Sequence, residues 1–450
     1  MIPLRLGEIE AATLASGDPD TAVTGVVCDS RLARPSALFV CLRGSRHDGH
    51  AFVAEAAARG AVAVLCEPGR AHGLGRLAVL EAEQPLAAFG AIGRAVRKRS
   101  RARVVGIAGS AGKTSAKDTL RALLAPHLPV VASPASFNNE LGVPLTLALL
   151  EPDTAGCVCE LGTGAPGELA ALCRIAAPDL GVITALGPEH LEFFATVEAV
   201  AAEEAALIAA LPPGAPLVLP ADADLLDPYR RGDLDEWRIG LEPGADVHPL
   251  AWRPSAAHTD AVFSVRGEQV SFKTNLRLPH HRLTLAAALA AYAALGLPLG
   301  RVGDGAAAVE LSPWRGQEHA LPGGGLLIND AYNANPLSLA TALHTLASRR
   351  DGGRAIAVLG EMAELGPDAP RWHADAGRLA AKLGIDLLVA VGPGALGYLG
   401  GAAGTVDCCW LPDTANAAQT LRKIVRPRDV VLLKGSRRAG LERIAEAVAR

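Results

Sequence analysis

Short apolar runs alternate with amphipathic segments along most of the chain. Runs rich in Ala, Val and Leu predict strands at 37–42 and 61–66, and the segment 52–59 between them has helical spacing. Similar apolar runs predict further strands at 103–108, 156–161, 180–185, 325–329, 355–359, 386–391 and 429–433. Strands that alternate with helices in this way predict an α/β fold with mostly parallel sheets.

The length of the chain and two breaks in the pattern predict several domains. A chain of 450 residues is too long for a single hydrophobic core. The basic run at 97–103 is typical of a solvated helix end and linker, and a phosphate or nucleic-acid patch is the alternative. A second break lies near 312–316. We therefore expect three domains, at residues 1–97, 98–312 and 313–450.

The central and C-terminal domains differ in their patterns. The central one begins with an apolar strand and a glycine-rich turn, which is typical of a phosphate-loop sheet. The Pro- and Gly-rich segments 211–220 and 241–254 predict turns and an irregular insertion. The strands and helices after 313 predict a Rossmann-like, doubly wound C-terminal domain.

Composition narrows the class of protein. Half of the residues are hydrophobic, which predicts a folded chain, and the net charge of −4 argues against a nucleic-acid-binding protein. None of the eight cysteines forms a C-x-x-C pair, so we expect buried thiols in a reducing cytoplasm. Charged residues at Arg5, Glu8 and Glu10 do not fit a signal peptide. The apolar run 283–299 contains Gly296 and Pro298, so we expect a buried helix and no membrane span.

A glycine-rich turn carries the clearest chemistry. It follows the predicted strand 103–108 and precedes a helical segment, with the residues Ala108, Gly109, Ser110, Ala111, Gly112, Lys113 and Thr114. Glycines let backbone N–H groups approach phosphate oxygens, Lys113 can reach the β- and γ-phosphates, and the Thr114 hydroxyl can bind Mg²⁺. An ordinary strand–helix turn with a surface lysine is the alternative. We predict an ATP site with Mg²⁺ here.

Together with this loop, several short segments resemble the Mur ligase family over essentially the whole chain. They are Asp29-Ser30-Arg31, Asp48-Gly49-His50, Asn138-Asn139-Glu140-Leu141-Gly142, Glu160-Leu161-Gly162, Asp330-Ala331-Tyr332-Asn333-Ala334-Asn335-Pro336, Gly360-Glu361-Met362-Ala363-Glu364 and Lys434-Gly435-Ser436-Arg437. The last three are similar to the branch of the family that adds D-alanyl-D-alanine to UDP-N-acetylmuramoyl-tripeptide in peptidoglycan synthesis. The resemblance implies a cytoplasmic, ATP-dependent ligase that works through an acyl phosphate, and we expect a monomer.

The resemblance also implies roles for individual residues. Catalysis and Mg²⁺ binding are expected at Lys113, Thr114, Glu160, His190 and Glu204. Nucleotide contacts are expected from the loop and from Asn139, Asp330, Asn333 and Asn335. Substrate contacts are expected at Ser30, Arg31, Asp48, His50, Lys434 and Arg437. For Glu160 a helix cap or salt bridge, for His190 a loop histidine bonded to backbone, and for Lys434 and Arg437 solvated side chains are the alternatives.

The chain departs from the family's pattern at three places. Glu204 occupies the position of a lysine that relatives carbamylate, so a glutamate would supply the negative charge directly; a solvated face at Glu203 and Glu204 is the alternative. His280, His281 and Thr284 replace an expected His-Asn and Asn, which leaves the adenine contacts open. Gln317 replaces an expected arginine, for which Arg315 can substitute.

These departures leave two other functions open. One is an amide ligase of the same superfamily with a different amine substrate, because no local feature specifies D-alanyl-D-alanine. The other is a non-catalytic nucleotide-binding scaffold. The sequence retains Lys113, Thr114, Glu160 and His190, which favours an active enzyme.

Overall fold

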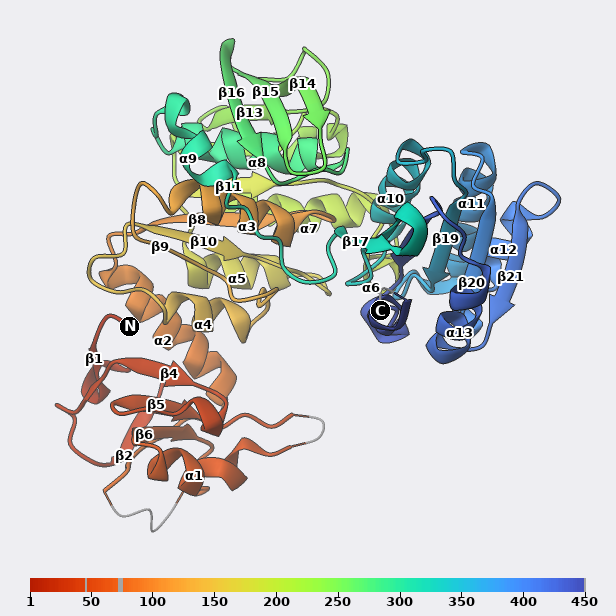
Figure 1. Ribbon diagram of the computed structural model, residues 1–450. Helices are drawn as coiled ribbons and strands as arrows, with labels where there is room; N and C mark the ends of the chain where they lie inside the picture. Colours follow the sequence, from red (N-terminus) through yellow and green to blue (C-terminus); the bar gives the residue numbers. More distant parts are fainter. Residues whose placement is uncertain (45–46, 72–75, 449–450) are drawn as a thin grey trace.

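The computed structural model describes residues 1–44, 47–71 and 76–448. Its three large sheets are α/β layers, and the predicted fold class is confirmed. Each sheet uses a separate part of the chain, and Figure 1 shows the three parts in red, in orange to green, and in blue. Among the described residues, no helix is long and apolar enough to cross a membrane.

The first sheet has five strands in the order β2-β7-β6-β5-β4, all parallel except for β2. Its elements are β2 Thr13–Ser16, β4 Gly25–Val27, β5 Ala37–Val40, β6 Ala61–Cys66, β7 Ala78–Glu81 and α1 Val53–Ala58. A further small sheet pairs β1 Leu4–Arg5 with β3 Ala22–Val23. Helix α2, Pro85–Arg99, follows this sheet and packs on α4 and α5 of the next part.

The basic run 97–103 lies at the end of α2, as expected for a helix end. However, it is not simply solvated. The Arg97 guanidinium pairs with Asp179 at 2.7 Å and also donates to the carbonyls of Ala176 and Ala177. The first and second parts are therefore joined by a polar anchor as well as by apolar packing.

The central sheet has nine strands in the order β16-β15-β14-β13-β12-β11-β8-β10-β9. They are β8 Arg103–Ala108, β9 Val130–Ala132, β10 Gly156–Glu160, β11 Leu180–Ile183, β12 Pro216–Pro220, β13 Asp235–Ile239, β14 Val247–Pro254, β15 Thr259–Val265 and β16 Glu268–Thr274. The first seven in chain order run parallel, and β15 and β16 are antiparallel.

Alternation along the buried strands places helices on both faces of this sheet. Val104 and Ala108 of β8 share one core with helices α4, α5 and α7, whereas Val105 and Ile107 share the other with α3 and α8. The helices are α3 Lys113–Leu124, α4 Gly142–Leu147, α5 Glu168–Ala176, α6 Leu191–Phe194, α7 Val197–Ala210, α8 His281–Ala294 and α9 Gly303–Ala306. The predicted buried helix within 283–299 is confirmed as α8.

The expectation of turns and an irregular insertion at 211–220 and 241–254 was wrong in part. Pro216–Pro220 is strand β12, and Val247–Pro254 is strand β14. The prolines mislead because Pro216 and Pro220 stand at the ends of β12, and the register of β14 shifts beside Pro249. Proline is tolerated at strand ends and bulges, where no ladder hydrogen bond is lost.

The third sheet has the order β17-β18-β22-β19-β20-β21, and only β17 is antiparallel. Its strands are β17 Gln317–Leu321, β18 Gly325–Asn329, β19 Ala355–Gly360, β20 Leu387–Val391, β21 Asp407–Leu411 and β22 Val430–Lys434. Helices cover both faces, which confirms the doubly wound arrangement. They are α10 Pro336–Ser348, α11 Ala369–Lys382, α12 Gly397–Ala402, α13 Thr414–Ile424 and α14 Glu442–Val448.

Candidate active site

A cavity of about 660 Å³ lies where the second and third sheets meet. Its lining includes the glycine-rich turn after β8, the residues that follow β10 and β11, the helices α8 and α10, and the ends of β18 and β22. Ligands of doubly wound sheets bind at the carboxyl ends of the strands, and both sheets present that edge to the cavity.

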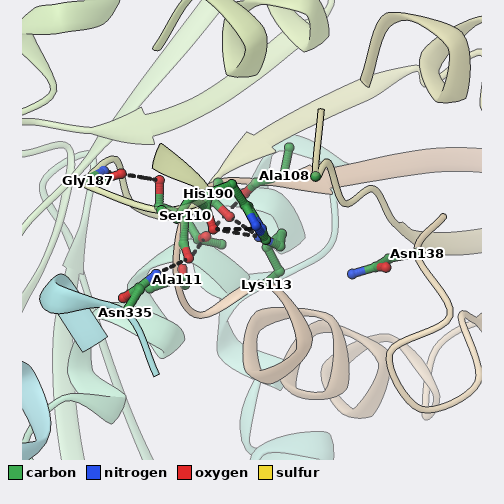
Figure 2. Close-up of polar contacts among 12 residues, drawn as sticks. Ala108, Ser110, Ala111, Lys113, Asn138, Gly187, His190 and Asn335 are labelled. Carbon is green, nitrogen blue, oxygen red and sulfur yellow. Dashed lines mark hydrogen bonds and ion pairs between the residues drawn. The ribbon is translucent and has the colours of Figure 1, made fainter. Parts of the chain in front are cut away.

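The backbone of the turn between β8 and α3 requires glycine at two positions. Gly109 has φ of +117°, and a Cβ there would lie 2.7–2.8 Å from atoms of Thr184; Gly112 has φ of +85°. Between them the Ser110 hydroxyl donates to Gly187 O at 3.0 Å, and Ser110 N donates to Ala185 O at 2.8 Å (Figure 2). The turn is thus braced against the segment after β11, and α3 begins at Lys113 with free N–H groups.

Lys113 stands in a buried group of carboxylates. Its Nζ donates to Gly109 O and lies 3.8 Å from Glu189 Oε2. Burial opposes the lysine charge, but the carboxylates of Glu189, Glu204 and Glu160 outweigh it and raise the pKa of Lys113. The charged form of the ammonium group is therefore favoured, and Lys113 lines the cavity.

Glu160, the last residue of β10, is 1% exposed and faces the start of α3. Its Oε1 accepts hydrogen bonds from Thr114 Oγ1 at 3.0 Å and from Asn138 Nδ2 at 2.9 Å, whereas its Oε2 is buried and has no partner among the described residues. A buried carboxylate oxygen without a donor is costly. This pair of oxygen donors fits Mg²⁺, which takes one or two carboxylates plus water and phosphate oxygens.

His190 is held by a residue from the third sheet. Its Nδ1 lies 2.5 Å from Glu364 Oε2, and its Nε2 lies 3.8 Å from Glu189 Oε2. The bond to Glu364 fixes the ring, as a carboxylate partner does for many metal-binding histidines. Within the described ranges, no three His, Cys, Asp or Glu side chains lie together as a ready-made metal cage. Phosphate oxygens would have to complete any cation site here.

Glu203 and Glu204 are both buried, so the alternative of a solvated face is wrong. Glu204 is 1% exposed and its Oε2 has no partner. Burial raises the pKa of Glu204 to about 8, opposed mainly by the charge of Lys113. A cation beside this carboxylate would favour its charged form.

Glu203 has a structural role. Its carboxylate accepts hydrogen bonds from the backbone N–H groups of Gly167 and Leu169, both at 2.7 Å, and from Thr163 Oγ1 at 3.2 Å. It thereby satisfies free N–H groups at the start of α5. The sequence could not show this role, because it does not reveal that α5 begins opposite α7.

Residues from the third part of the chain contact the glycine-rich turn and line the cavity. Asn335 caps α10, and its Nδ2 donates to Ser110 O at 2.9 Å, which Figure 2 shows as a bond between the two chain segments. Lys434 is 3% exposed; its Nζ pairs with Asp330 at 2.6 Å and donates to Asn333 O at 3.0 Å. The alternative of a solvated Lys434 is therefore wrong.

Asn139 and Arg437 are two further residues that were predicted to contact nucleotide or substrate, and only Asn139 lines the cavity. Asn139 lines the cavity, and its Oδ1 accepts from the backbone N–H groups of Leu141 and Gly142 at the start of α4. Arg437 pairs with Glu442 at 2.7 Å and lies over the Trp314 ring, outside the cavity lining.

The residues that depart from the family's pattern lie in different surroundings, some in the cavity lining and some outside it. On α8, His280 and Thr284 line the cavity, whereas His281 is 4% exposed and turned into the core. Arg315 lines the cavity and lies over the Tyr332 ring at 4.0 Å, with its Nε buried and unpartnered. Gln317 accepts from Trp314 N at 3.0 Å and faces a different hollow. The cavity thus contains a guanidinium, although not from the position where the family's pattern has it.

The residues predicted to hold a sugar nucleotide lie in or beside short 3-10 helices of the first part of the chain, outside the cavity lining. The Ser30 hydroxyl donates to Glu55 at 2.7 Å, and Arg31 pairs with Asp29. His50 uses both ring nitrogens within the protein: Nδ1 faces Asp48 Oδ1 at 2.6 Å, and Nε2 accepts from Glu67 N at 3.1 Å. Of this group Arg31 has the most exposed side chain, 76%, and is the freest to contact a ligand.

Sequence reasoning missed Glu189 as a functional candidate. Glu189 is 6% exposed and lies between Lys113 and His190, with Oε1 unpartnered. Its position directly before the predicted histidine was the only available signal. Arg315 and Glu364 belong to segments that the sequence singles out, but the directions of their side chains were not predictable from it.

Family comparisons cover nearly the whole chain. Residues 22–129 match the Mur ligase family, catalytic domain; residues 107–294 match the Mur ligase middle domain; and residues 315–437 match the Mur ligase, glutamate ligase domain. The UDP-N-acetylmuramoyl-tripeptide–D-alanyl-D-alanine ligase of Mycobacterium tuberculosis is 34% identical, over 99% of this chain and 96% of that one. The enzyme of that name from Escherichia coli is 30% identical, over 98% and 96%.

Solved structures have the same architecture. A crystal structure of MurF from Acinetobacter baumannii has a TM-score of 0.85 at 26% identity and covers 96% of this chain and 94% of that one. The MurF ligase from Thermotoga maritima in complex with ADP has a TM-score of 0.83 at 28% identity, with coverage of 94% and 97%.

The Glu203 contacts lead to a stability prediction. Glu203→Gln should lower the free energy of unfolding by about 1–3 kcal/mol, because a charged acceptor of buried N–H groups is lost. Urea denaturation followed by circular dichroism measures the change. Glu268→Gln on exposed β16 is the matched control and should be neutral. Equal stability of the two variants would contradict a capping role for Glu203.

Proposed function

The chain belongs to the Mur ligase family, and from that premise we propose that it joins D-alanyl-D-alanine to UDP-N-acetylmuramoyl-tripeptide in peptidoglycan synthesis. The terminal carboxylate of the tripeptide attacks the γ-phosphorus of ATP. ADP departs as the leaving group, and the tripeptide becomes an acyl phosphate. The amine then attacks the acyl carbon, phosphate leaves, and the nitrogen loses a proton. The observation that carries this proposal is a single cavity that contains Lys113, Glu160, Asn335 and Lys434.

The charged groups of the cavity suit this reaction. Several anionic groups of ATP and of the two peptide substrates must approach one another, so positioning and neutralisation of charge contribute most to the rate. Lys113 would neutralise the transferring phosphate, and the N–H groups of the turn would hold the β-phosphate. Arg315 supplies a second cationic group in the cavity. Lys434, fixed by Asp330, would orient the acyl phosphate or the amine substrate.

Mg²⁺ would be held by Thr114 and Glu160, and there it would neutralise phosphate charge. The buried, unpartnered oxygens of Glu160 and Glu204 support such a site. His190, with its ring fixed by Glu364, and Glu204 would serve a second cation position. Glu204 would supply the negative charge there without carbamylation, unlike the lysine of relatives.

Each of the three parts of the chain would bind a different reactant. Residues 1–97 would bind the UDP-sugar, 98–312 would bind ATP, and 313–450 would bind the amine and close the cavity. The exposed Arg31 and the hydrogen-bonded Ser30, Asp48 and His50 of the first sheet support a rigid binding face for the sugar nucleotide. We propose that the enzyme acts as a monomer in the cytoplasm.

Phosphate release tests the reaction and the role of Lys113. The protein should release phosphate from ATP only when UDP-N-acetylmuramoyl-tripeptide and D-alanyl-D-alanine are both present. Lys113→Ala should stay folded and lose about 100-fold or more in kcat, because a cation at the transferring phosphate is removed. Lys423→Ala, an exposed lysine on α13, is the control. Preference for another amine would overturn the substrate assignment, and no turnover with any amine would indicate a non-catalytic scaffold.

The glutamate at position 204 should free the enzyme from dependence on CO₂. The parent protein should keep full activity in buffers depleted of CO₂ and bicarbonate. Glu204→Gln should lower kcat about tenfold or more, because the charge that favours a cation is lost. Glu198→Gln, on the exposed face of the same helix, should be unaffected. Loss of parent activity without CO₂, or normal turnover of Glu204→Gln, would refute the role of Glu204.

Arg315 should take the place of the arginine expected at Gln317. Arg315→Ala should raise the KM for ATP about tenfold, which corresponds to roughly 1.4 kcal/mol. Gln317→Ala should change it by about twofold at most, since Gln317 faces away from the cavity. Initial rates at saturating peptide substrates measure both. The opposite order of effects would mean that the guanidinium does not contact the nucleotide.

A further inference from the structure

Lys117, one turn after the glycine-rich turn, is the most deeply buried lysine that none of the proposed roles uses. It is 2% exposed, on the face of α3 that points toward the segment 133–138. Burying an ammonium group is costly unless its hydrogen bonds are satisfied. An apolar residue would fill the same space without that cost, so the contacts of Lys117 are informative.

The Lys117 ammonium has three acceptors. It donates to Ser133 O at 2.8 Å and to Ala135 O, and it pairs with Asp118 Oδ1 at 3.0 Å. Two of its three N–H groups are used in hydrogen bonds, and the ion pair with Asp118 balances its charge. Ala135 has φ of +47°, a left-handed conformation that is strained for alanine. Lys117 therefore holds the segment in a shape that its own backbone disfavours.

The same segment determines where the Glu160 carboxylate lies. Ser133 Oγ accepts a hydrogen bond from Glu160 N at 2.9 Å, and Asn138 Nδ2 donates to Glu160 Oε1 at 2.9 Å. Only Ser133 stands between the Lys117 ammonium and the backbone of Glu160. A change at Lys117 is thus transmitted to Glu160 through two hydrogen bonds.

Asp118 extends the network to the start of the linker before the third sheet. Its Oδ2 accepts from Ser312 N at 2.7 Å, just before the linker that leads to Arg315 and β17. The segment 133–138 also touches the third sheet, through the hydroxyls of Ser136 and Tyr332. Helix α3 is thereby tied to the start of the linker, and the segment that Lys117 holds is tied to the third part of the chain.

We propose that Lys117, with Asp118, is a positioning residue that sets Glu160 beside Thr114 and couples the phosphate-binding helix to the C-terminal part. This role rests on the proposed use of ATP with a divalent cation at Glu160. It predicts that loss of the pair leaves the phosphate-binding turn intact but misplaces the Glu160 carboxylate.

The test uses the double variant Lys117→Met with Asp118→Asn, which avoids leaving a buried carboxylate unpaired. The amide oxygen introduced by Asp118→Asn would still accept from Ser312 N, so a major loss of folding is not expected. Arg121→Met is the control, since Arg121 is an exposed cation one turn further along α3. Calorimetric titration measures ADP affinity with EDTA and again with Mn²⁺, and kcat is measured with all three substrates.

We expect ADP affinity in EDTA to stay within about threefold of the parent, while the gain in affinity from Mn²⁺ and the kcat both fall about tenfold or more. The control should match the parent. An equal loss of ADP affinity in EDTA would mean that Lys117 supports only the turn, and unchanged Mn²⁺ enhancement would mean that it does not position Glu160. Either result overturns the proposal.

Two further arms keep the outcome decisive. If the double variant does not fold, Ser133→Ala removes the acceptor of Glu160 N while Lys117 stays in place, and it should give the same selective loss; parent-like Mn²⁺ enhancement in Ser133→Ala would overturn the proposal. An inactive parent protein would instead count against the proposed reaction, and the ADP and Mn²⁺ titrations would still decide the role of Lys117.

Discussion

The balance of charge around Lys113 is the constraint on which the rest of the cavity depends. One ammonium group lies among three buried glutamates, Glu160, Glu189 and Glu204, each with a carboxylate oxygen that has no partner in the described part of the chain. Such an arrangement is costly by itself, because buried charges must be paired or neutralised. In the proposed function, cations that enter with a nucleotide would offset this cost, and the turn would bind the phosphates. The site without ligands therefore carries an electrostatic cost from its buried carboxylates.

The surrounding fold keeps this group rigid. Glycines at 109 and 112 give the turn its shape, Ser110 braces it against Gly187, and Asn335 reaches it from the third sheet. Parallel sheets present several strand ends at one edge, so residues far apart in sequence meet without long loops. Two contacts between the second and third parts are polar pairs, His190 with Glu364 and Asn335 with the carbonyl of Ser110.

The sequence determined the local features of this protein. Apolar runs predicted the strands β5, β6, β8, β10, β11, β18, β19, β20 and β22 and the doubly wound C-terminal domain, because burial imposes a pattern that neighbouring residues already show. The glycine-rich turn was readable for the same reason, since its backbone requires glycine whatever surrounds it. Strands such as β13, β15, β16 and β21 were not predicted. Proline misled only in β12 and β14, where strand ends and a bulge remove the usual penalty.

Only the tertiary structure decided which side chains face the cavity. Side chains close together in the sequence have different surroundings. Glu204 faces Lys113, whereas Glu203 caps α5. Arg315 lines the cavity, whereas Gln317 turns away from it. The burial of Lys117 and the meeting of His190 with Glu364 also depend on contacts between elements remote in the chain. The periodicity of the sequence shows which residues share one side of a helix or strand. Which other element covers that side depends on how the helices and strands pack.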